Sequence, residues 1–328
     1  MFAGLLNKGF RGSLALLIIL FLLSAALNYF SRVPLENNAY PDLFYNYFTR
    51  NLENKFLINS LNFFCIGLGV LLMSMITSNQ EISDKQNYFP VFLYLFICVA
   101  AVNPVQITPQ IFTNVFVLLS LYMLLDIYRK EKVFKSIFEA AFWLSCSAFI
   151  TISSIISFPL FFTILVVLRP FYWREWAIAL LGFLTPVFLY ESLAYLFDFN
   201  QWFLFDAIAL FTKYMKVPVF SEYYFPLLLF LFVLLVLSIA NVLLYGSGNT
   251  VKKQRAKTIF FWYLFFCVFG FFSGGANTSS ILLLSAVPVS FFAGDFLYGI
   301  RQSKITNTLI TLLMLCVLVV ALGKAGVF

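Results

Sequence analysis

The sequence predicts an all-α, polytopic helical membrane protein with about eleven transmembrane segments and a cytoplasmic N-terminus. Of its 328 residues, 62% are hydrophobic and only 11% are charged, whereas a soluble domain carries about 25% charged residues. Apolar runs of roughly 18 residues recur along the whole chain. These runs do not alternate as the strands of a membrane β-barrel would. Positions 1–328 are therefore expected to form a single integral membrane domain.

The apolar runs follow one another in order along the chain. The first run, 14–30, comes after Lys8 and Arg11 and resembles a signal peptide. No small-residue cleavage site closes it, so we expect a retained helix. The other runs cover residues 56–77, 89–102, 111–127, 137–152, 155–168, 177–197, 223–245, 258–272, 279–297 and 305–322.

Residues 137–168 leave three alternatives open: two short spans, a re-entrant hairpin, or one long bent helix. The stretch "ITISSIIS" at 150–157 supplies small and hydroxylated residues where a turn can form. The segments that flank 137–168 are both basic, so both are expected on the cytoplasmic side. A hairpin or two spans satisfy that expectation, and a single crossing does not.

The basic residues predict the orientation of the bundle. With the N-terminus in the cytoplasm, the inner segments hold 15 of the 21 Lys and Arg residues, while the 14 acids divide equally between the two sides. Lys and Arg, and hardly the acids, decide orientation in membranes. The cytoplasmic loops that result are 128–136, 169–176 and 246–257.

The loop "RPFYWREW" at 169–176 combines arginines with aromatic side chains where the chain leaves the membrane. Tryptophan favours the headgroup layer, and arginine can meet lipid phosphates. Glu175 is expected in the first turn of the next helix, where a negative charge is favourable. Four side chains are therefore predicted to lie at lipid headgroups: Arg169, Trp173, Arg174 and Trp176.

Two outer segments, 31–55 and 198–222, are longer than a turn and rich in aromatic residues. Their patterns predict short amphipathic helices that lie on the membrane surface. A third outer stretch, "SGGANTSS" at 273–280, is small and polar, and Asn277 there is a candidate substrate-binding residue or a helix cap. Glu191, toward the outer end of its helix, is a second such candidate.

Histidine is absent from the chain, which removes the commonest general base and metal ligand. The five cysteines are not spaced as metal or redox pairs, and no glycine-rich nucleotide motif is present. We therefore expect no metal, no cofactor and no nucleic-acid partner. Asn62, Asn114 and Asn241 lie within apolar runs, and we expect them to form hydrogen bonds between helices.

The stretch 139–191 combines "FW" near the start of an apolar helix, a Phe-Pro step, "RPFYWREW" and "GFLTP". In these features the chain resembles an uncharacterised family of multi-spanning inner-membrane proteins from Bacteroidota. The resemblance implies a multi-pass protein of the bacterial inner membrane. It implies no activity, because the family has none assigned.

The architecture also resembles, more distantly, that of membrane glycosyltransferases that take sugars from polyprenyl-phosphate carriers. That resemblance implies a catalytic role for acids in the first outer loop, here Glu36 and Asp42. Either carboxylate would act as base toward an acceptor hydroxyl, while Arg32 or Arg50 would hold the phosphate. The two acids lie six residues apart in a short loop, which departs from the tight acidic pair or the larger loop of those enzymes.

Three functions remain open from the sequence. The first is a non-catalytic subunit of a cell-envelope membrane complex, in assembly or export, with membrane lipids and membrane proteins as partners. The second is an enzyme or handler of polyprenyl-phosphate-linked substrates on the outer face. The third is a transporter or flippase, which is supported by Glu191 and by the interrupted helices near 150–159. We favour the subunit because, of the three functions, it depends least on residue types that are absent from the chain.

Overall fold

The computed structural model describes residues 55–79, 87–102, 108–128, 130, 132–151, 154–155, 157–169, 171–197, 222–245, 251–270, 278–300 and 303–324. All regular secondary structure within these residues is helical, which confirms the predicted all-α class. The first apolar run, 14–30, lies outside the described residues. So do nearly all of segments 31–55 and 198–222, with their predicted surface helices.

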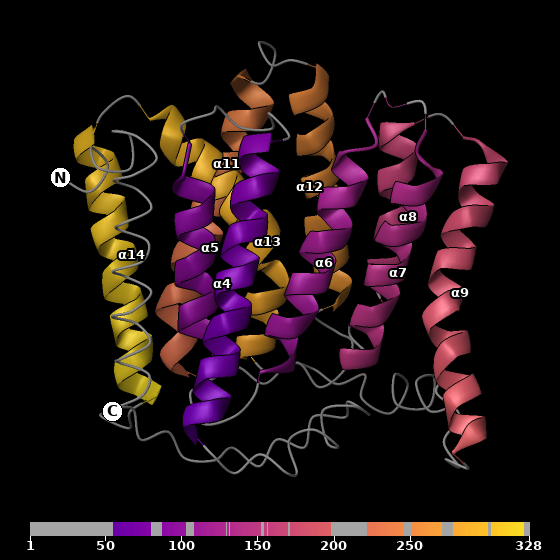
Figure 1. Ribbon diagram of the computed structural model, residues 1–328. Coiled ribbons are helices and arrows are strands. Elements are labelled where there is room, and N and C mark those ends of the chain that lie inside the picture. Colours follow the sequence, from indigo (N-terminus) through magenta and orange to yellow (C-terminus); the bar gives the residue numbers. More distant parts are fainter. Residues whose placement is uncertain are drawn as a thin grey trace.

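Each apolar run after the first corresponds to one helix (Figure 1). The correspondence is expected, because inside a lipid bilayer a segment must satisfy its backbone hydrogen bonds internally. In chain order the elements are α4 (Lys55–Asn79), α5 (Phe89–Ala101), α6 (Pro109–Leu125), α7 (Phe134–Ile150), α8 (Ser157–Leu168), α9 (Trp173–Leu196), the 3-10 turn η2 (Glu222–Tyr224), α11 (Phe225–Tyr245), α12 (Val251–Gly270), α13 (Thr278–Gly299) and α14 (Ser303–Lys324).

Five of the described helices are long and apolar enough to cross a membrane. They cover Leu57–Ser78, Trp173–Leu196, Glu222–Leu244, Thr278–Gly299 and Lys304–Lys324. Phe89–Ala101, Pro109–Leu125 and Ser157–Leu168 are apolar but shorter. This set fits a multi-pass membrane protein, while the total of about eleven spans stays a prediction.

The chain reverses direction between α7 and α8 and again between α8 and α9. Helices α7 and α9 run in the same direction, because later residues of one contact later residues of the other. Gly182 lies against Ala141, and Tyr190 lies beside Phe149. Contacts between α8 and α9 run the opposite way, from Phe162 with Trp176 to Phe158 with Phe183. Residues 137–168 are therefore two helices that run in opposite directions, and the single long bent helix is excluded.

Helix α13 forms the centre of the bundle. Of its apolar window, 78% is buried, against 28% for α9 and for α14. It packs against α5, α6, α11 and α12, and its approach to α5 is close because residue 294 is a glycine. A Cβ atom at Gly294 would lie 2.4 Å from the backbone nitrogen of Pro90. On the α12 side, the rings of Phe260 and Phe291 stack with centroids 4.1 Å apart.

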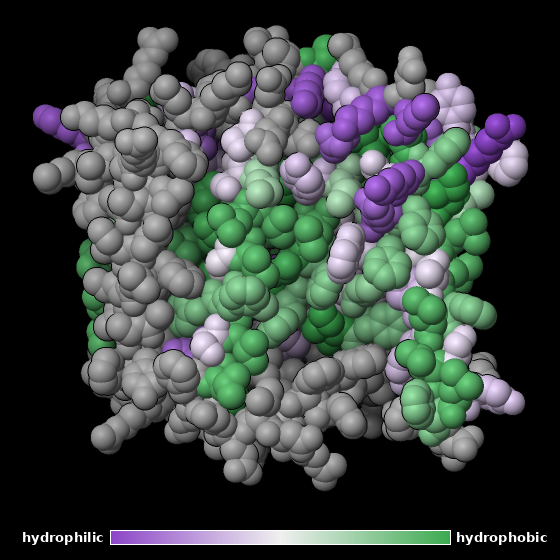
Figure 2. Space-filling model, viewed as in Figure 1, coloured by the Kyte–Doolittle hydropathy of each residue, from purple (hydrophilic) through white to green (hydrophobic). Residues whose placement is uncertain are grey.

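Charged side chains gather at one end of the bundle. This charged end carries Asp126, Lys135, Arg169, Arg255 and Asp295, and it is the upper end in Figure 1. Figure 2 shows hydrophilic side chains along it and hydrophobic ones over the middle of the molecule. Helices α14 and α9 stand at opposite edges of the bundle (Figure 1). We call the lower end the far end.

Two helices begin inside segments that the hydropathy pattern assigns to loops. Helix α9 begins at Trp173 and α12 begins at Val251, so all of 251–257 is helix although the sequence predicts a loop for 246–257. The physical reason is that the first turns of α12 are polar yet packed: Ala256 is buried and Lys257 pairs with Asp295. Hydropathy detects only the apolar part of such a helix.

Candidate functional site

At the charged end, Arg169 and Glu175 bridge the turn between α8 and α9. Arg169 Nη1 lies 3.1 Å from Glu175 Oε1, and the Glu175 side chain is almost fully buried. Glu175 lies in the first turn of α9, as the sequence predicts, where the helix dipole favours a carboxylate. The ion pair therefore joins the end of α8 to the first turn of α9.

Arg255 of α12 joins the same region from the other side. Its Nη1 donates a hydrogen bond of 2.8 Å to the carbonyl oxygen of Leu168, the last residue of α8. Its guanidinium also lies 5.2 Å from the centroid of the Tyr128 ring. An arginine at a helix C-terminus satisfies a carbonyl that has no partner within the helix. Arg255 thus ties α12 to α8 and to the end of α6.

Lys257 and Asp295 form an ion pair between α12 and α13 that is largely enclosed. Their Nζ and Oδ2 atoms lie 2.8 Å apart, with 12% and 14% of the side chains exposed. Two further pairs, Lys130 with Asp126 and Lys135 with Glu139, lie closer to solvent. Exposed pairs contribute little to stability, so the Lys257–Asp295 pair is the one that matters for packing α12 on α13.

The four predicted headgroup residues divide into two kinds. Trp173 is 68% exposed, and the Arg174 guanidinium lies 5.8 Å from its ring centroid. Trp176 instead stacks on Phe162 of α8, with centroids 4.9 Å apart, while Arg169 is engaged by Glu175. Trp173 and Arg174 thus face outward, where headgroups would be, and Trp176 and Arg169 pack against the bundle. The headgroup role stays a prediction.

At the far end, Lys324 closes the C-terminus of α5. Its Nζ donates hydrogen bonds of 2.7 Å and 2.6 Å to the carbonyl oxygens of Ala100 and Val102, and it lies 5.5 Å from the Tyr224 ring centroid. The side chain is buried. In the sequence, Lys324 is simply one of the basic residues assigned to the outer side. Its partner helix lies more than 200 residues away, and no local pattern reveals that.

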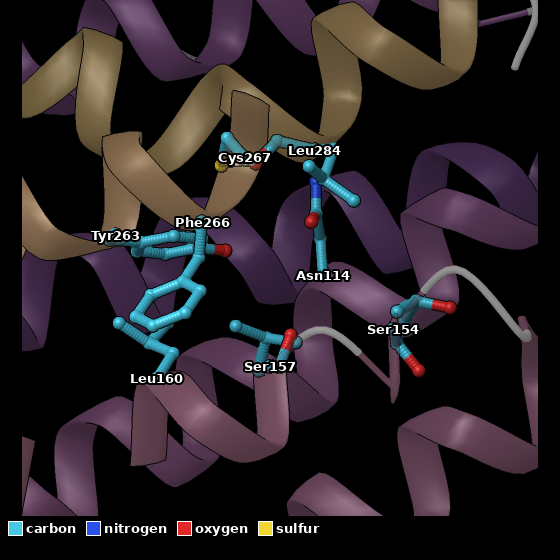
Figure 3. A pocket seen from close by; sticks show the side chains of 10 residues that line it. Asn114, Ser154, Ser157, Leu160, Tyr263, Phe266, Cys267 and Leu284 are labelled. Atoms are coloured by element: carbon cyan, nitrogen blue, oxygen red, sulfur yellow. Dashed lines mark hydrogen bonds between the residues drawn. The ribbon is translucent and has the colours of Figure 1, made fainter. Parts of the chain in front are cut away.

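A small pocket lies between α6, α8, α12 and α13, toward the far end of the bundle. It has a volume of about 20 Å³, enough for one water-sized group. No charged side chain is among its lining residues, which are Thr113, Asn114, Val117, Ser154, Ser157, Leu160, Tyr263, Phe266, Cys267 and Leu284. Figure 3 shows Tyr263 and Asn114 on opposite sides of this space.

Several polar groups around the pocket already have partners. The hydroxyls of Thr113 and Thr151 lie 2.9 Å apart, and the Asn114 amide donates a bond of 2.7 Å to the Leu283 carbonyl. Just before the start of α6, the backbone N–H of Thr108 donates to Oδ1 of Asn62 of α4 at 3.2 Å. The predicted role of Asn62 and Asn114 in bonding between helices is therefore confirmed.

The remaining predicted site residues divide by position. Arg32, Glu36, Asp42, Arg50 and Asn277 lie outside the described residues. Glu191 lies on α9, 18 residues after Trp173 and hence about 27 Å along the helix at 1.5 Å per residue. Its Oε1 atom is buried and has no hydrogen-bond partner within the part of the chain that the structure describes.

Clusters of metal-ligating side chains are also not found within the described ranges: no three His, Cys, Asp or Glu residues there come together. The five cysteines, all described, are free thiols.

The comparisons with known proteins place the chain in a family without assigning an activity. Residues 13–327 match a family of unknown function (DUF6427), and the chain belongs to this family. No curated protein and no solved structure matches the chain.

Proposed function

We propose that the protein is a non-catalytic subunit of a cell-envelope membrane complex, and that α9 is the helix that contacts its partner. In this proposal the chain crosses the bacterial inner membrane about eleven times. The charged end faces the cytoplasm, because Lys and Arg concentrate on that side of membrane proteins.

The observation that supports the proposal is the Glu191 carboxylate, whose buried Oε1 atom has no partner within the described residues, next to exposed apolar side chains of a helix at the edge of the bundle. Leu184 and Phe188 of α9 are 56% and 71% exposed. Glu191 follows at spacings of seven and three residues, and such spacings place side chains on one face of a helix. Lipid tails provide the apolar surroundings that the leucine and the phenylalanine need. They provide no hydrogen-bonding partner for the carboxyl group of Glu191.

The position of Glu191 defines the kind of partner. A residue about 27 Å along α9 lies near the outer boundary of a hydrocarbon layer about 30 Å thick. An ionisable group at that depth calls for a hydrogen-bonding or charged partner. The partner that fits is a helix of a second membrane protein, with an apolar face against Leu184 and Phe188 and a basic or amide side chain level with Glu191.

Photocrosslinking in native membranes tests this assignment. A photoreactive amino acid at Phe188 is expected to give one discrete protein adduct, whose partner mass spectrometry then identifies. The matched control is Phe232 of α11, which is 67% exposed and is expected to react with lipid only. Glu191→Gln should lower the adduct yield from Phe188, while Ser192→Ala, its neighbour, should not. Lipid adducts alone at both phenylalanines would contradict the proposal.

A further inference from the structure

We infer that the pocket between α6, α8, α12 and α13 is a binding site for an uncharged hydroxyl group. The inference is independent of the proposed partner contact on α9, because it rests on buried groups of other helices. Three side chains from three helices carry it: Asn114 of α6, Ser157 of α8 and Tyr263 of α12.

Each of these side chains has a polar atom that makes no hydrogen bond within the described residues. The Asn114 amide nitrogen is used by Leu283, which leaves its Oδ1 atom as a free acceptor. Ser157 Oγ and the Tyr263 hydroxyl have no partner there either. Asn114, Ser157 and Tyr263 are only 3%, 9% and 4% exposed, and all three line the pocket.

Buried polar groups are nearly always satisfied in proteins, and leaving one unsatisfied lowers stability. Three such groups that line one pocket therefore point to a shared partner. Figure 3 shows the Tyr263 hydroxyl pointing across the pocket toward Asn114. The surrounding polar groups, including the Thr113–Thr151 hydroxyl pair, are already bonded and do not compete for it.

The chemistry of the three groups selects the occupant. Asn114 Oδ1 only accepts a hydrogen bond, whereas a serine or tyrosine hydroxyl donates or accepts. A hydroxyl can donate to the amide oxygen and accept from Tyr263 or Ser157. No charged residue lines the pocket, so an ion would lie there without compensation.

The size of the pocket also limits which group can bind there. Its volume of about 20 Å³ exceeds the roughly 10–15 Å³ that one water needs but leaves little more space. The occupant is thus a single hydroxyl, which comes either from water or from the end of an uncharged alcohol. Both sources offer the same donor and acceptor to the three side chains.

A double-mutant cycle on the purified full-length protein tests whether the groups share one occupant. We expect Tyr263→Phe and Ser157→Ala each to lower the folding equilibrium constant about fivefold, as for a lost buried hydrogen bond. Because both changes remove bonds to one hydroxyl, the double variant should lose much less than the product of the two factors. The control is Ser285→Ala, whose hydroxyl bonds only to its own helix. It should combine multiplicatively with Tyr263→Phe.

A high-resolution structure of the same preparation, with mass spectrometry of its extract, identifies the source. Density beside Asn114 and Tyr263 with no co-purified molecule would assign water. A stoichiometric alcohol that Tyr263→Phe removes would assign a bound ligand. Multiplicative effects of the two pocket variants, together with an empty pocket at a resolution that shows water elsewhere, would overturn the inference.

Discussion

Lys257 of α12 and Asp295 of α13 lie 2.8 Å apart, between their Nζ and Oδ2 atoms, with both side chains largely withdrawn from solvent. Removing only one partner leaves the other charge enclosed without compensation. We expect Asp295→Asn or Lys257→Met to lower the free energy of unfolding by about 1.5–3 kcal/mol, the range for a hydrogen bond to a charged group. Reversible unfolding in detergent measures it.

The control for this pair is the double variant Lys257→Met/Asp295→Leu. Because it leaves no enclosed charge, its cost should be smaller than the sum of the two single costs. Additive costs would show that the two residues act separately.

Gly294 is expected to tolerate no side chain, because a Cβ atom there would lie 2.4 Å from the Pro90 nitrogen. The backbone cannot yield as a flexible side chain would, so Gly294→Ala should lower the free energy of unfolding by about 1–3 kcal/mol. Gly67 of α4 is the matched control, since a Cβ atom there meets nothing within 4 Å. Gly67→Ala should be neutral or raise stability by up to about 1 kcal/mol through helix propensity. Equal effects at both glycines would refute the argument.

Lys324 is expected to hold α14 against the C-terminus of α5. Lys324→Met removes two hydrogen bonds to backbone carbonyls and should lower the unfolding midpoint in detergent. The expected loss is about 1.5–3 kcal/mol. Lys304, at the other end of α14, is exposed, so Lys304→Met should change stability by less than about 0.5 kcal/mol. A similar loss for both variants would argue against a specific role for Lys324.

The predicted orientation is tested by thiol labelling in a cysteine-free background. Lys135→Cys, at the charged end, should react with a membrane-impermeant maleimide only after the cells are permeabilised. Glu222→Cys, at the far end, should react in intact cells. The reverse pattern would place the charged end outside and would contradict the positive-inside assignment.

Asp42→Asn separates the proposed subunit from the enzyme alternative. The subunit proposal expects the photocrosslinked complex at Phe188 to form at an unchanged yield. The enzyme alternative expects lost turnover of a polyprenyl-phosphate-linked substrate while the protein stays in the membrane. Accumulation of such a substrate in cells that carry only the variant would favour the enzyme.

Helix positions could be predicted from the sequence because lipid imposes a local rule. A run such as 223–245 must be helical wherever it packs, and α11 covers Phe225–Tyr245. The reversal near residue 151 was also among the predicted alternatives, since basic flanks on both sides of 137–168 favour a turn. These inferences need no knowledge of distant contacts.

The pocket and the bonds between distant helices could not be predicted, because they depend on segments far apart in the chain. Asn114 meets Leu283 across 169 residues, and Arg255 meets Leu168 across 87. Hydropathy does not detect such partners. It also placed the start of α12 too late, because the charged first turns of that helix pack through contacts that only the bundle creates.

The bond from Lys324 to Val102 spans 222 residues, and this separation bears on how the protein is made. Helix α5 emerges from the ribosome long before α14. During synthesis the last carbonyls of α5 therefore need temporary partners, such as water, lipid headgroups or the insertion machinery. The order of synthesis thus separates membrane insertion from final assembly, and α14 completes α5 only when nearly every intervening helix is already in place.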